Sequence, residues 1–147
     1  MVNFFNKKQE ENPISVMLSD LSENQKMSVV NLLLTIGVCD GDQGNQEKEI
    51  QFLNTYVSIL DVRQDKCTPY LEAYGYTRII SDLKTISQRQ KEFLIVSVWD
   101  MIICDGRPND TELRVASDLF EQFGVPEDLF YDTIQKTQAL MKHFFGK

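Results

Sequence analysis

One pattern occurs twice in this chain, as CDGDQGNQE at residues 39–47 and as CDGRPNDTE at residues 104–112. In each copy a run of apolar residues leads into Cys-Asp-Gly, and a Glu follows seven residues after the Asp. Glycine tolerates the left-handed conformation in which helices commonly end, and a negative charge is favoured in the first turn of a helix. The pattern therefore predicts, twice, one helix that ends at Asp-Gly and another that begins near the Glu.

The helices that lead into the two patterns share a start signal. Ser22 is followed three residues later by Gln25, and Ser87 is followed at the same distance by Gln90. A Ser three residues before a Gln is the form of a capping box, in which each side chain bonds the backbone N–H of the other residue. The repeat thus extends from the start of one helix to the start of the next, and it predicts two similar helix–turn–helix halves.

The rest of the chain also has the composition and spacing of helices. The segments 23–38 and 88–103 are apolar on almost every side, which is typical of helices at the centre of a bundle. A further amphipathic helix is expected to end near Val62. Thr68-Pro69 is then expected to begin another helix, which Gly75 interrupts.

Two more helices are expected after the second pattern. Asp110 is expected to cap the first of these helices, and Gly124 is expected to end it. Val125-Pro126 is expected to open the second, which is the last helix of the chain. No segment alternates apolar and polar residues with the period of a half-buried strand. We therefore predict an all-α bundle of six or seven helices, with residues 1–12 as a flexible leader and residues 13–147 as a single domain.

Composition and charge limit the classes of function. Lys and Arg total 15 against 22 Asp and Glu, which gives a formal charge of −7 and argues against a nucleic-acid partner, since phosphate binding needs a basic face. The three cysteines, Cys39, Cys67 and Cys104, form no C-x-x-C pair and are odd in number, which favours a reducing compartment. Neither a signal peptide nor an apolar run of the ~20 residues that a membrane helix needs is found, so we expect a cytoplasmic protein.

The repeated pattern places two carboxylates close together in each copy. If each loop folds back, Asp40 can approach Glu47, and Asp105 can approach Glu112, so that their oxygens suit a hard divalent cation. The same residues also have a purely structural interpretation. An Asp beside a Gly turn can bond the local backbone, and a Glu in a first helical turn is already favoured by the helix dipole. Spacing alone leaves both interpretations open.

The first loop is not an EF-hand. Counting Asp40 as position one, Asn45 stands at position six where that loop requires Gly, and Gln51 stands at position twelve where it requires Glu. Counting from the Asp of the second copy, Asp110 and Ala116 occupy the same two positions. Any cation in these loops is held by a different arrangement of ligands.

Nothing in the sequence supports catalysis or an organic cofactor. His143 is the only histidine, so neither a Ser-His-Asp nor a Cys-His arrangement has support. The Glu-x-x-His motifs of di-iron bundles and the glycine-rich loops of nucleotide-binding proteins do not occur. We predict a protein that is not an enzyme.

With the repeat in view, the chain resembles the TerB family of tellurite-resistance proteins and their relatives. The resemblance is carried by Asp40-Gly41 with Glu47 and by Asp105-Gly106 with Glu112, and it covers about residues 13 to 143. The Ser-x-x-Gln-Lys openings of the two halves agree with the same plan. Cys stands before each Asp-Gly where relatives often have Ala.

The resemblance implies an all-helical bundle that binds a divalent cation such as calcium through its acidic positions, here Asp40, Glu47, Asp105 and Glu112. It also implies protein partners and a place in a stress-response system that includes membrane proteins. The alternative is an interaction or scaffold domain in which the loops only connect helices and hold no metal.

Overall fold

The computed structural model describes residues 18, 20–38, 46–103 and 110–145, which form six helices and no strand. In chain order these are α3 (Glu23–Val38), α4 (Gln46–Leu60), α5 (Gln64–Lys84), α6 (Gln88–Ile102), α7 (Asp110–Gln122) and α8 (Glu127–Phe145). The prediction of an all-α bundle is confirmed. The expected leader and both Cys-Asp-Gly turns lie outside the described residues.

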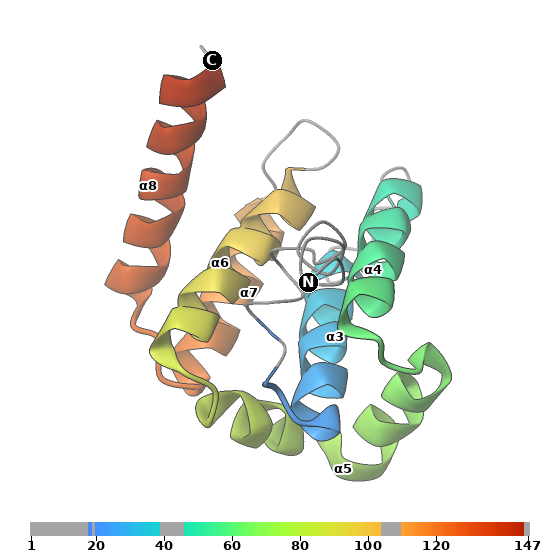
Figure 1. The fold of residues 1–147 in the computed structure, drawn as a ribbon. Coiled ribbons are helices and arrows are strands. Elements are labelled where there is room, and N and C mark those ends of the chain that lie inside the picture. The colour runs from blue at the N-terminus through green and yellow to red at the C-terminus, as the bar shows by residue number, and fades with distance from the viewer. Residues whose placement is uncertain (1–17, 19, 39–45, 104–109, 146–147) are drawn as a thin grey trace, which may run out of the picture.

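Helices α3 and α6 form the centre of the bundle, as their all-round apolar sequences predicted. Helix α3 packs against α4, α5, α6 and α7, and α6 also contacts α4, α7 and α8. In Figure 1 both helices point their C-terminal ends toward the same end of the molecule. Their fully buried side chains include Val29, Leu33 and Ile36 from α3 and Leu94, Ile95 and Val98 from α6.

Both predicted capping boxes form. The Ser22 hydroxyl accepts from the Gln25 N–H at 3.1 Å, and the Gln25 side chain accepts from the Ser22 N–H at 2.8 Å. The matching distances between Ser87 and Gln90 are 3.1 and 2.9 Å. A cap of this kind stabilises a helix by about 1 kcal/mol, and here it defines the first residue of each central helix.

Helices α4 and α7 end in the same way. Asp61, with φ 55°, follows α4, and Gly124, with φ 99°, follows α7. The next residue, Val62 or Val125, is buried, and its N–H bonds back to a carbonyl five residues earlier, as in a Schellman motif. The sequence predicted the glycine end, whereas the left-handed Asp61 was not predicted.

The start of α5 corrects one prediction. The helix begins at Gln64, so Thr68-Pro69 lies inside it rather than opening it. Arg63 precedes the helix without a side-chain cap and instead forms an ion pair with Asp65 at 2.8 Å. The reversal after α4 already directs the chain into a new helix, and Pro69 removes the hydrogen bond that an N–H at this position would have donated to the carbonyl of residue 65.

Helices α5 and α8 differ in shape. Gly75, with φ 73° and ψ 178°, bends α5, as predicted, and the segment after the bend packs Ile79 and Leu83 into the core. Helix α8 has no such bend and runs along the edge of the molecule in Figure 1. Its early residues Phe130 and Ile134 are buried, whereas Leu140 is 58% exposed.

Candidate functional site

The two predicted ligands that the structure describes have different surroundings. Glu47 lies in the first turn of α4 and is exposed, whereas Glu112 lies in the first turn of α7 and is only 2% exposed. Asp40 and Asp105 lie outside the described residues, so the geometry of the two acidic pairs is not defined here. Equal positions in the sequence repeat therefore do not have equal burial.

The donor chemistry of these positions suits a hard cation, because carboxylate oxygens are the ligands that such ions prefer. Glu112 is also favoured as an anion by the N-terminal end of α7. Within residues 18, 20–38, 46–103 and 110–145, no group of three or more His, Cys, Asp or Glu side chains is placed to hold a metal.

Sequence reasoning missed a polar cluster around the bend of α5, a region that we call the elbow and define as residues 70–82. The Tyr70 hydroxyl, before the bend, donates a hydrogen bond to the Asp82 carboxylate after it. Ser28 of α3 donates to the same carboxylate oxygen at 2.7 Å. One carboxylate thus joins both arms of α5 to the central helix. Its only sequence signal was Gly75 inside a helical pattern.

Burial and charge both act on the hydroxyl in this cluster. Burial raises the pKa of Tyr70 above its ordinary value, and the hydrogen bond to Asp82 raises that pKa further, although Arg78 acts in the opposite sense. The neutral phenol is therefore the stable form, and it serves as a structural donor.

The outer side of the elbow carries aromatic rings. The rings of Tyr70 and Tyr74 lie 5.1 Å apart, and the Arg78 guanidinium lies over the Tyr74 ring at 4.6 Å. Beyond the bend, the Tyr76 hydroxyl lies 3.4 Å from the hydroxyl of Thr35, whose own hydrogen is donated to the Asn31 carbonyl at 2.8 Å. Three of these residues, at positions 70, 74 and 78, follow at the four-residue spacing of helical neighbours.

A buried amide holds the first arm of α5 on α3. Asn31 donates to the Cys67 carbonyl at 2.9 Å, and its side-chain oxygen accepts no hydrogen bond within the described structure. Burial raises the pKa of the Cys67 thiol, and the charges of Glu23 and Asp65 add to that rise. Cys67 is thus a buried neutral thiol, which makes a poor nucleophile.

A second buried tyrosine joins α4 to α6. The Tyr56 hydroxyl donates to Ser97, whose own hydroxyl donates to the Phe93 carbonyl at 3.1 Å. Burial raises the pKa of Tyr56, and the negative charge of Asp100 raises it further. Asp100, near the end of α6, has an exposed side chain, although partial desolvation still raises its pKa. These contacts pack helices and do not form a catalytic arrangement.

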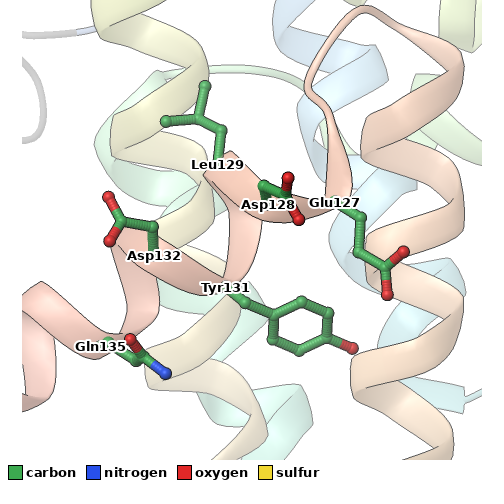
Figure 2. A pocket seen from close by; sticks show the side chains of 6 residues that line it. All are labelled: Glu127, Asp128, Leu129, Tyr131, Asp132 and Gln135. Atoms are coloured by element: carbon green, nitrogen blue, oxygen red, sulfur yellow. The ribbon is translucent and has the colours of Figure 1, made fainter.

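An open hollow of about 500 Å³ lies on the first turns of α8. Figure 2 shows Glu127 and Tyr131 extending to the same side of the helix, with Asp132 projecting away from them. Asp132 forms an ion pair with Lys136 one turn later at 3.0 Å. Three acidic residues line this hollow, which disfavours an anionic substrate.

No helix in the described part of the chain is long and apolar enough to cross a membrane. No family model, curated protein or solved structure matches the chain. The resemblance to the TerB family therefore rests on the repeated sequence pattern.

Proposed function

We propose that this protein is a non-enzymatic, TerB-like stress-response module of the cytoplasm that binds a divalent cation through its two repeated acidic loops and acts on partner proteins. The observation that carries the proposal is the matched arrangement of the two helices that lead into those loops. A duplicated pair of loops that begins from equivalent helices is suited to a duplicated function.

The match lies in two reciprocal hydrogen bonds. The Gln25 amide of the first capping box donates to Thr85, just before the second box, at 2.9 Å. The Gln90 amide of the second box donates to Asp20, just before the first box. The two donors, Gln25 and Gln90, are 65 residues apart, and so are the two acceptors, Asp20 and Thr85. The two acidic patterns have the same offset. Helices α3 and α6 thus begin side by side through equivalent contacts.

The proposed ligands are Asp40 with Glu47 in the first loop and Asp105 with Glu112 in the second. Since Glu47 is exposed and Glu112 is buried, the two loops are expected to bind with different affinities. The buried carboxylate has less freedom to lose on binding, so the second loop is proposed to be the tighter site.

Calorimetric titration with calcium, magnesium and manganese tests the proposal. Wild-type protein should bind at least one of these ions, Asp105→Asn should remove the tighter phase, and Asp40→Asn should remove the weaker one. Glu72→Gln is the matched control, because Glu72 is an exposed carboxylate outside the loops. Absence of binding to folded wild-type protein would refute the cation site.

The second candidate is an interaction or scaffold domain without a metal. It is favoured by the exposure of two tyrosines at the elbow, Tyr74 and Tyr76. Under this alternative the protein binds a partner equally well with and without a chelator, whereas a cation-dependent module loses partner binding when the ion is removed.

A further inference from the structure

Helix α8 consists of an acidic part followed by a basic part. Residues 127–132 contain three carboxylates and no basic residue, whereas residues 133–145 contain Lys136 and Lys142 and no carboxylate. This distribution suits the helix dipole, and it also suits an antiparallel helix of the same sequence, because each part then meets the part of opposite charge. The exposed side of α8 and the hollow on its first turns favour the second role.

One side of α8 carries apolar side chains outside the buried face. The helix lies at the edge of the molecule in Figure 1 and packs Phe130 and Ile134 against the core. Leu129 and Leu140 are eleven positions apart, which is about three helical turns, so they lie on the same side of the helix, with Lys136 between them. Leu129 is half-buried and Leu140 is 58% exposed, so this side presents an apolar group to a partner.

The hollow on the first turns of α8 fits the exposed leucine of a second copy. Leu129 and Tyr131 line it beside the three carboxylates (Figure 2). If two copies of α8 pair antiparallel about a point between residues 134 and 135, Leu140 of one copy lies opposite Leu129 of the other. Residues 127–132 of one copy then lie along residues 137–142 of the other, and the two-fold axis repeats both contacts. A single register therefore matches the apolar groups and the charges.

We propose that α8 pairs antiparallel with α8 of a second copy of this chain, which makes the protein a two-fold symmetric dimer. Within the described residues Asp132 pairs with Lys136 at 3.0 Å, whereas Glu127 and Asp128 form no ion pair, so they are available to the lysines of the second copy. A single pair of helices is a small interface, which is typical of reversible association. The dimer goes beyond the proposed function and needs no bound cation.

Sedimentation velocity of the full-length protein in the presence of a chelator tests the proposal. Wild-type protein at about 5–500 μM should show a reversible dimer with a dissociation constant of roughly 10–100 μM. Leu140→Asp should weaken dimerisation at least about tenfold, because it removes the apolar contact and places a carboxylate against the acidic part of the second copy. Ile50→Asp is the matched control, since Ile50 is 52% exposed on α4, and it should leave dimerisation unchanged.

Charge exchange tests the antiparallel orientation. Glu127→Lys combined with Asp128→Lys leaves both parts of α8 with a net positive charge, and Lys136→Glu combined with Lys142→Glu leaves both parts negative. Each double variant should therefore be monomeric by itself, whereas an equimolar mixture should form a heterodimer, because opposite charges then meet at both ends. Glu72→Lys, at an exposed carboxylate of α5, is the charge control and should dimerise like wild type.

Circular dichroism of each variant separates lost association from lost folding. Three results would overturn the proposal: a wild-type protein that is monomeric at every concentration, a folded Leu140→Asp that dimerises as tightly as wild type, or a mixture of the two double variants that stays monomeric. Because a chelator is present throughout, a failed dimerisation test is distinct from a failed calorimetric test of the loops.

Discussion

The hydroxyl of Tyr70 donates a hydrogen bond to the carboxylate of Asp82 across the bend that Gly75 makes in α5. The two residues are twelve positions apart and belong to different arms of one helix. The bond closes the bend, and Ser28 adds a second donor from α3. The shape of α5 therefore depends on one carboxylate.

We expect Asp82→Ala to lower the free energy of unfolding by about 2–3 kcal/mol, because it leaves two hydroxyl donors without their charged acceptor. Tyr70→Phe should cost about 1–2 kcal/mol, and the double variant should cost less than the sum of the two. Urea denaturation of the four proteins in this double-mutant cycle measures the coupling. Ser81→Ala, an exposed neighbour, is the control, and strict additivity would show that the bond between Tyr70 and Asp82 contributes nothing.

The stability of the protein should fall as the pH rises above about 10. Burial raises the pKa of Tyr56 and of Tyr70 above the ordinary value of 10.0. In that range the unfolded chain loses phenolic protons that the folded protein keeps, so stability is complete below pH 10 and is lost as the pH approaches the folded pKa values.

Thermal denaturation should show this loss of stability between about pH 8 and 11, a range chosen around the ordinary tyrosine pKa. Tyr56→Phe should reduce the slope of stability against pH. Val98→Ala is the control, since it destabilises the core without removing a tyrosine and should keep the full slope. An equal alkaline slope in wild type, Tyr56→Phe and Tyr70→Phe would contradict the prediction.

The two left-handed helix ends should respond oppositely to exchange of their residues. Gly124→Ala should cost about 1–2 kcal/mol, because φ 99° strains any residue with a Cβ. Asp61→Gly should stabilise the protein by about 0.5–1 kcal/mol, because it relieves a non-glycine residue of φ 55°. Chemical denaturation measures both, and a stabilising Gly124→Ala would show that α7 can end in another way.

The two capping boxes should differ when Gln is replaced by Glu. Glu and Gln both accept the hydrogen bond of a capping box at this position. Gln25→Glu, opposite Thr85, should therefore change the free energy of unfolding by less than about 0.5 kcal/mol. Gln90 is buried and donates to Asp20, so Gln90→Glu would place two carboxylates together and should cost about 1–3 kcal/mol. Equal effects of the two variants at neutral pH would contradict the reciprocal bonding of the two boxes. At a pH low enough to protonate the carboxylates, the difference should shrink.

The parts of the fold that short stretches of sequence encode were predicted well. Ser22 with Gln25 and Ser87 with Gln90 defined the starts of α3 and α6, and Gly124 the end of α7, since each signal acts through hydrogen bonds within a few residues. The prediction that a helix begins at Thr68-Pro69 was wrong, because it also used only a local signal. A local signal of moderate strength was overridden by the reversal that ends α4.

The candidate sites depended far more on tertiary structure. The elbow joins Tyr70 and Ser28 to Asp82 over separations of twelve and 54 residues, and no local pattern specifies such a contact. The same holds for the reciprocal bonds of Gln25 and Gln90. A repeat can predict that two residues are equivalent, but it does not predict which partners lie across from them.

The sequence by itself determined that this protein is an all-α bundle with two apolar central helices and two copies of one acidic sequence pattern, because periodicity, caps and glycine ends are encoded locally. Only the tertiary structure decided that Glu112 is buried while Glu47 is exposed, and that the Arg78 guanidinium lies over the Tyr74 ring. The physical reason is that burial is a property of what packs around a side chain, and those neighbours come from helices distant in the sequence.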